Sequence, residues 1–248
     1  MNSSIPLLIN TSGNTLELIL NNPDKRNALN SEIMGALVSA LEGVPLYNHL
    51  RAVVIRGEGS VFCSGAEVSS WKPRELQSLL RSIVDCPIPT IVYAHGACLG
   101  GGMGIACASD FVLADEATKF GFPEVRIGMI PSIISPYVAR KLSINKMREL
   151  FITGEKFDTS AAISLGLVYR VSKNNREKLI QSLLTDIEKG APIAQRRIKG
   201  LLNSDTINMP IKERDLELSK LISEIRKSEE GKEGLNSFLE KRKPNWVE

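Results

Sequence analysis

Residues 94–107 read AHGACLGGGMGIAC, a short apolar stretch that runs through consecutive glycines into a segment of helix-forming residues. Three successive glycines, Gly100 to Gly102, let the backbone turn sharply and bring its N–H groups close to another group. A helix that begins there presents unpaired N–H donors and the positive end of its dipole. The pattern therefore predicts a turn at the end of a buried strand. Taken alone, the turn fits a tight connection, and it also suits stabilisation of negative charge developing on a bound group.

Strands and helices are expected to alternate on both sides of this turn. Short apolar runs are typical of strands buried on both faces, and residues recurring at three- and four-residue spacing indicate helices. Strands are expected at 15–20, 52–55, 90–93, 111–114 and 167–171, and helices after Asn30 and at 73–84, 135–142 and 146–152. The alternation predicts an α/β fold.

The sequence changes character after Ser172 and becomes helical throughout, at 177–189, 194–202 and 211–227. The last of these carries an apolar stripe that fits the chain's own core or a neighbouring subunit equally well. The stripe consists of Leu218, Leu221, Ile222 and Ile225. We therefore divide the chain into an α/β core over residues 1–190 and a helical region over 191–248 that serves in oligomerisation or as a lid.

The composition argues against several classes of function. The 248 residues are 43% hydrophobic and carry a net charge of only +3, which does not favour a nucleic-acid partner. Four cysteines without a CxxC pair, and only two histidines, support neither a metal site nor a redox motif. We find no signal peptide and no apolar run long enough to span a membrane, so a cytoplasmic protein without a membrane partner is expected.

Two further stretches have the residues that a reactive site needs. VFCSGAEV at 61–68 places small residues soon after a predicted strand, where backbone N–H groups can approach a ligand. KFGFPEVRIGMIP at 119–131 sets Glu124 in an apolar run, where loss of solvent would raise its pKa toward values useful for proton transfer. Taken alone, Glu124 fits a surface ion pair with Arg126 as well. No nucleotide-binding GxGxxG or GxxxxGK[ST] pattern occurs.

Five stretches match one family in order and spacing: NPDKRNAL at 22–29, FCSGAEV at 62–68, GGG at 100–102, FGFPEVRIG at 120–128 and EGLNSFLEKRKP at 233–244. On these residues the chain resembles the enoyl-CoA hydratase/isomerase (crotonase) superfamily over nearly its whole length. The resemblance implies a crotonase-like spiral of ββα units with a helical C-terminal layer, assembled as a homotrimer or a dimer of trimers. It also implies a role in fatty acid metabolism, on an acyl-CoA thioester. No separate cofactor is implied, because coenzyme A is part of the substrate.

The resemblance further assigns roles to individual residues. The N–H groups of Ala66 and Gly101 would form the oxyanion hole for the thioester carbonyl, and Glu124 would be the principal proton-transfer residue. The expected substrate contacts are Lys25, Arg26, Ala28, Ser64, Gly65, Ala66, Glu67, Val68, Gly101 and Lys241. Of these, Lys25, Arg26 and Lys241 would lie near the phosphates of coenzyme A, Lys241 from a neighbouring subunit in one arrangement. Solvated surface charge is the alternative for all three.

The sequence departs from the family at the second catalytic position. Standard hydratases hold water between two glutamates, and Gly104 stands where the first of these belongs. Residues 127–137, IGMIPSIISPY, resemble bacterial methylglutaconyl-CoA hydratase-type members that also carry glycine there. We therefore expect a hydratase with one catalytic glutamate. A double-bond isomerase using Glu124 and a catalytically silent acyl-CoA-binding protein are the alternatives. Glu67 in place of aspartate and a short 68–89 segment leave the acyl group open.

Overall fold

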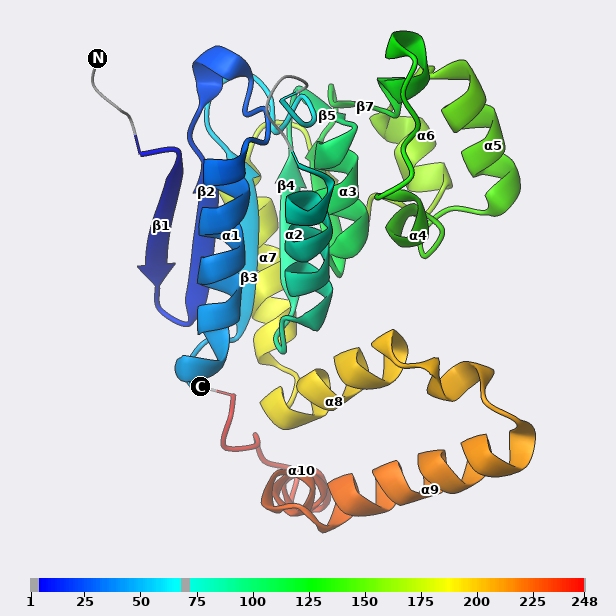
Figure 1. Ribbon diagram of the computed structural model, residues 1–248. Coiled ribbons are helices and arrows are strands. Elements are labelled where there is room, and N and C mark those ends of the chain that lie inside the picture. The colour runs from blue at the N-terminus through cyan, green and yellow to red at the C-terminus, as the bar shows by residue number, and fades with distance from the viewer. Residues whose placement is uncertain (1–4, 68–71, 248) are drawn as a thin grey trace.

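The computed structural model describes residues 5–67 and 72–247, and its centre is a six-stranded sheet in the order β1-β2-β3-β4-β6-β9 (Figure 1). β1 runs antiparallel to β2, and every later neighbour is parallel. The strands are β1 (Leu7–Ser12), β2 (Thr15–Leu20), β3 (Ala52–Gly57), β4 (Thr90–Ala94), β6 (Phe111–Asp115) and β9 (Arg170–Ser172). The parallel strands are apolar on both faces because helices cover both sides.

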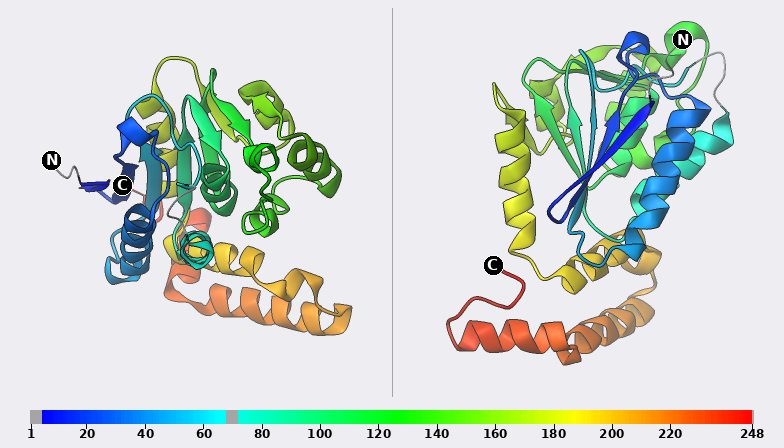
Figure 2. Two further views of the ribbon diagram at one scale, coloured as in Figure 1. Left: turned by 45° about the horizontal axis from the view of Figure 1, so that its top comes forward. Right: turned by 90° about the vertical axis from the view of Figure 1, so that its left-hand side faces the viewer.

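Helices sandwich this sheet, as the edge-on view of Figure 2 shows. One face packs against α1 (Ser31–Gly43), α2 (Pro73–Asp85) and α3 (Gly101–Ala108), and the other against α7 (Arg176–Glu188). The helices begin where the sequence supplies caps: the Asn30 side chain accepts the Ile33 N–H at 2.9 Å, and Pro73 opens α2. All eight residues of α3 are buried, so this helix lies at the centre of the packing.

A second, three-stranded sheet lies next to α3 and positions the reactive loops. It consists of β5 (Ala97–Leu99), β7 (Lys119–Gly121) and β8 (Lys156–Asp158), with β7 parallel to β5 and antiparallel to β8. The peripheral helices α4 (Ser135–Val138), α5 (Ile144–Thr153) and α6 (Thr159–Ser164) stand beside it (Figure 1). The two sheets diverge from adjacent segments of chain, since β4 and β5 are separated only by the turn at His95 and Gly96.

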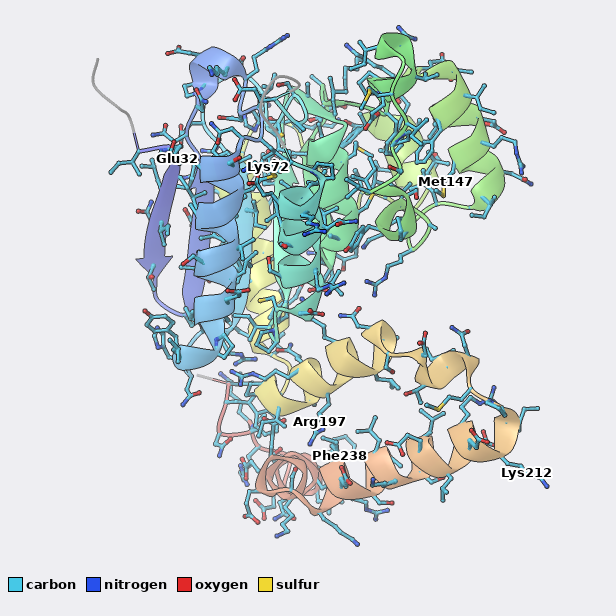
Figure 3. The ribbon with its side chains drawn as sticks, in the orientation of Figure 1. Glu32, Lys72, Met147, Arg197, Lys212 and Phe238 are labelled. Atoms are coloured by element: carbon cyan, nitrogen blue, oxygen red, sulfur yellow. The ribbon has the colours of Figure 1, made fainter. Side chains whose placement is uncertain are left out.

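The C-terminal helices form an arm at the foot of the main sheet (Figure 1). They are α8 (Pro192–Asn203), α9 (Ile211–Lys227) and α10 (Glu229–Leu239). α9 buries none of its residues, and Ile222 of its predicted apolar stripe is 64% exposed. Figure 3 shows Arg197 on α8, Phe238 on α10 and Lys212 at the far end of the arm, and the Phe238 ring is 80% exposed. Within one chain, part of the apolar surface of the arm is thus left exposed, while Leu218, Leu221 and Ile225 of the stripe are half-buried.

Most of the long elements agree with the sequence-based expectations, and most of the missed elements are short. All five predicted strands and the helices in 31–43, 73–85, 144–153, 176–188, 192–203 and 211–227 are present. The strand expected at 167–171 is confined to β9, and the helix expected at 135–142 ends at Val138. The sequence analysis did not identify β1, β5, β7, β8, α6 or α10. All four cysteines are free and buried, and no helix in the described part of the chain is long and apolar enough to cross a membrane.

Candidate active site

Two glycine-containing loops are joined edge to edge at the start of α3. Cys63 and Cys98 form an isolated parallel bridge, in which the Cys63 N–H donates to Ala97 O at 3.1 Å and the Leu99 N–H to Cys63 O at 3.0 Å. A β-carbon at Gly102 would lie 2.8 Å from the Cys63 β-carbon, so only glycine allows this approach. The first loop is therefore held against the turn that starts the helix.

This junction brings the two expected N–H donors together. A β-carbon built on Gly101 would lie 3.3 Å from the Ala66 nitrogen, and Gly65 and Gly100 beside them have φ of +114° and +49°. Side chains rarely adopt such backbone conformations, which explains glycine at both positions. Within the described part of the chain, neither the Ala66 nor the Gly101 N–H has a backbone acceptor. The pair can therefore donate to a bound carbonyl oxygen.

Glu124 faces these donors from the short 3₁₀ helix Pro123–Ile127, which follows β7 directly. Its Oε1 would lie 3.3 Å from a β-carbon on Gly100, and its buried Oε2 has no hydrogen-bond partner among the described residues. Burial raises the pKa of Glu124, because the carboxylate loses solvent without gaining a cation. The surface pair with Arg126 is not formed, and the Arg126 side chain instead lies beside Gly154.

A cavity of about 300 Å³ lies between the loops and Glu124. Its polar side is formed by the glycine-containing loops and the carboxyl group, while the opposite wall is aliphatic. That wall consists of Leu76, Ile127, Met129, Ile130, Ile133 and Ile134, with Pro123, Pro131 and Ser132 beside them. The predicted residues Ser64, Gly65, Ala66, Gly101 and Glu124 thus line one pocket. Most of the aliphatic wall was missed, although its signal was visible as the apolar run after Glu124.

The place of the missing second carboxylate is filled by apolar side chains. A β-carbon on Gly104 would lie 2.6 Å from Ile134 Cγ2 and 3.3 Å from both Leu80 methyl groups. Gly104 is fully enclosed in α3 and does not line the cavity. A glutamate at this position would have to displace Ile134, so the departure at Gly104 is part of the packing.

Lys25, Arg26 and Ala28, which were predicted to contact the substrate, do not line the cavity. The Lys25 ammonium pairs with Glu67 Oε1 at 2.7 Å, and the Ala28 N–H donates to Lys25 O at 3.1 Å. Arg26, with φ of +52°, accepts the Ser64 N–H on its carbonyl at 3.0 Å. The contacts of Lys25, Ala28 and Arg26 are thus made outside the cavity lining.

The two remaining predicted contacts are Val68 and Lys241. Val68 lies outside the described residues. Lys241 follows α10 on the arm and does not line the cavity of its own chain, so a contact from a neighbouring subunit stays a prediction.

Asn27 is a structural residue that the sequence analysis overlooked. Its buried amide donates to Glu58 O at 2.8 Å and to Val61 O at 2.9 Å, and its Oδ1 accepts the Asn22 N–H at 2.9 Å. These bonds fasten the 22–29 turn to the loop that carries Ala66, so Asn27 supports the donor geometry without entering the cavity. Its polar side chain inside a family-like motif was the available signal.

Paired N–H donors facing a desolvated carboxyl group can stabilise an enolate and move a proton next to it. That combination suits an enzyme that acts on an activated carbonyl compound. The family pattern described as Enoyl-CoA hydratase/isomerase matches residues 10–248, and the chain belongs to this family of enzymes. The family implies an acyl-CoA substrate.

Relatives and solved structures agree with this assignment. A Bacillus subtilis (strain 168) protein described as a probable enoyl-CoA hydratase is 32% identical over 243 residues, covering 92% of this chain and 93% of the relative. The structure of Pseudomonas aeruginosa AtuE superposes with a TM-score of 0.92 at 30% identity and covers 98% of this chain and all of that one. An enoyl-CoA hydratase from Shewanella pealeana ATCC 700345 gives a TM-score of 0.91 at 29% identity, covering 97% and 96%. The fold is therefore crotonase-like, with its C-terminal helices included.

Proposed function

We propose that this enzyme adds water across the double bond of an enoyl-CoA, with Glu124 as the single acid and base and the N–H groups of Ala66 and Gly101 as the oxyanion hole. The observation that carries the proposal is the Glu124 carboxyl, whose buried Oε2 has no partner among the described residues and which faces the paired donors across the cavity. A carboxyl held this way, with its pKa raised by burial, is suited to accept and return a proton.

The proposed reaction has two steps. Ionised Glu124 takes a proton from water while the water oxygen bonds to C3, and the C2–C3 π electrons move into the thioester as an enolate. The Ala66 and Gly101 N–H groups stabilise the enolate oxygen, where removing one such donor typically costs about 10²–10³ in rate. Protonated Glu124 then delivers its proton to C2, the carbonyl re-forms, and the carboxylate is regenerated.

Double-bond isomerisation is the second candidate, and the packing at Gly104 favours it. Ile134 and Leu80 fill the place of a second carboxylate, so no acidic side chain there holds water opposite Glu124. An isomerase needs only one base: Glu124 would remove a proton from C2 of a 3-enoyl-CoA and return it to C4. The resemblance of residues 127–137 to methylglutaconyl-CoA hydratase-type members supports hydration instead.

The quaternary structure is proposed on similar grounds. The exposed apolar surface of the arm, with Leu216, Ile222 and Phe238 between 64% and 80% exposed, supports burial against further copies of the chain in a homotrimer or a dimer of trimers. A cytoplasmic location remains a prediction from the sequence.

Absorbance of the conjugated enoyl thioester separates the candidates. Crotonyl-CoA, 3-methylglutaconyl-CoA and a 3-enoyl-CoA are each followed with the native enzyme, with Glu124→Gln and with the control Glu116→Gln, whose side chain is 66% exposed. Loss of signal from either of the first two substrates supports hydration, and a gain from the third supports isomerisation. We expect Glu124→Gln to lower turnover by about 10²–10⁴-fold and Glu116→Gln to leave it unchanged. Equal rates for native enzyme and Glu124→Gln would refute the role of Glu124.

A further inference from the structure

The cavity beyond Glu124 is lined by aliphatic groups, and this limits the charge of the acyl chain. We propose that the enzyme selects uncharged aliphatic acyl groups and discriminates against acyl chains that end in a second carboxylate. The inference rests on the proposed function, which places the thioester carbonyl at Ala66 and Gly101 and directs the acyl chain toward Ile130 and Ile134.

The lining provides the first argument. Among the described residues that line the cavity, Glu124 is the only charged side chain, and the hydroxyls of Ser64 and Ser132 are the only neutral polar ones. The aliphatic side chains suit methyl and methylene groups, which gain from leaving water. A carboxylate placed among them would find no cation and would face the Glu124 carboxyl, a like charge.

The nearby cations provide the second argument, because none of Lys25, Lys72 and Arg126 lines the cavity. Lys72, at the start of α2, lies 3.5 Å from Glu75 Oε1, and Figure 3 shows it near the upper end of that helix. Lys25 pairs with Glu67. The Arg126 Nε lies 3.2 Å from the place of a β-carbon on Gly154, so its side chain runs along α5's end and does not line the cavity.

The four residues between the described segments cannot supply a positive charge either. Positions 68–71 are Val, Ser, Ser and Trp, and none of these side chains is cationic. A second carboxylate bound in this chain's cavity would therefore give up part of its hydration without gaining an ion-pair partner among the described lining residues. Because Ile130 is 75% exposed, the loss of hydration is partial, and a penalty of about 1.4 kcal/mol is enough for a tenfold effect.

A matched pair of substrates tests the proposal. 3-Methylglutaconyl-CoA and 3,5-dimethylhex-2-enoyl-CoA have the same branching at C3 and differ in a terminal carboxylate against an isopropyl group of similar shape. We expect kcat/KM to be at least about tenfold higher for the uncharged substrate. Equal values, or a preference for the acid, would overturn the proposal and would point to a cation supplied by a neighbouring subunit.

Binding of saturated analogues keeps the test independent of the reaction. 3-Methylglutaryl-CoA and 3,5-dimethylhexanoyl-CoA cannot be hydrated or isomerised, and titration calorimetry gives their dissociation constants directly. Tighter binding of the uncharged analogue by about tenfold supports the selectivity even if no enoyl-CoA is turned over, which would count against the proposed function alone. Equal or tighter binding of the acid overturns the selectivity whatever the catalytic result.

A positive charge introduced at the cavity wall tests whether charge sets the preference between the two substrates. Ile130 is 75% exposed, so Ile130→Lys adds a cation without disturbing the core, and Ile130→Gln is the uncharged polar control. We expect Ile130→Lys to shift the kcat/KM ratio toward the acid by about two- to fivefold, in line with a partly solvated ion pair. The control should change kcat/KM for both substrates by a similar factor and leave their ratio unchanged. Equal shifts in both variants would mean that polarity, and not charge, decides the selection.

Discussion

Two partly buried carboxyl groups in this protein, those of Asp110 and Glu124, differ in the partners that they have. Asp110, in the turn before β6, accepts from the Lys199 ammonium at 2.7 Å and from the Thr90 N–H and hydroxyl at 2.8 and 2.9 Å. Glu124 has a buried oxygen with no partner among the described residues. Asp110 therefore links α8 to the main sheet, whereas the Glu124 carboxyl group is available for reaction.

The difference follows from what surrounds each group. Lys199 projects from α8, is 8% exposed, and also donates to the carbonyl of Ile88 at 3.1 Å, so its charge is compensated from several directions. This network fastens the first helix of the arm to the sheet. Around Glu124, the described residues that line the cavity include no cation, and most of them are apolar. A satisfied polar group stabilises the fold, while a buried carboxyl oxygen without a described partner is a candidate for a functional site.

Breaking the paired group should have the largest effect on stability. Asp110→Ala removes the only carboxylate that pairs with Lys199 in the described part of the chain, leaving a buried ammonium, and we expect the free energy of unfolding to fall by about 3 kcal/mol. Urea unfolding at neutral pH measures the change. Asp186→Ala, which breaks exposed pairs with Arg170 and Lys189, is the control and should cost less than about 1 kcal/mol. Similar losses in both variants would show that the Lys199 site is no more than a surface pair.

Filling the space at Gly104 tests why Glu124 acts alone. Gly104→Ala places a methyl group 2.6 Å from Ile134 Cγ2, and we expect overpacking to lower the free energy of unfolding by about 1–3 kcal/mol. Gly35→Ala is the control, because nothing lies within 4 Å of its β-carbon in the middle of α1, and it should stabilise by about 0.5–1 kcal/mol.

A double-mutant cycle isolates the contact at Gly104. Ile134→Ala removes Cγ2, so the combined variant should be more stable than the sum of the two single effects predicts. Additive effects would mean that Ile134 does not close this position.

Much of this architecture could be predicted, because long elements carry their own signals. The Asn30 cap, the opening proline of α2 and the apolar runs of β3, β4 and β6 are local features that need no tertiary context. β5, β7 and β8 have three residues each, too few to show alternation, and they form only because the loops pair with one another.

The parts of the site that carry sequence motifs were predicted. The parts that depend on contacts between residues far apart in the sequence were missed. The glycine turn and Glu124 were identified from their stretches and from the family resemblance. The Asp110–Lys199 pair joins residues 89 positions apart, and the enclosure of Gly104 by Ile134 depends on how a loop folds back onto α3. Neither is visible in a local pattern, because each arises from the packing of separate elements.

Replacing Glu124 with glutamine should have the smallest effect on stability, and the direction of that effect tests the contrast between Glu124 and Asp110. Burial raises the pKa of Glu124 in the folded state, so folding favours its protonated form. The contribution of this group to stability is full below the unfolded pKa of about 4.3 and is lost as the pH rises through the folded value. At pH 7.5 the ionised Glu124 therefore lowers the free energy of unfolding of the native enzyme, and Glu124→Gln removes this penalty.

We accordingly expect Glu124→Gln to be more stable than the native enzyme at pH 7.5 and the difference to shrink or vanish near pH 4. Urea unfolding at the two pH values measures it, and the gain is small because the carboxyl retains access to the cavity. Asp110→Asn is the matched comparison and should destabilise at pH 7.5, because it removes charge from a paired site. A Glu124→Gln variant that is less stable at pH 7.5 would mean that the carboxylate has a charged partner, and the contrast between the two groups would then fail.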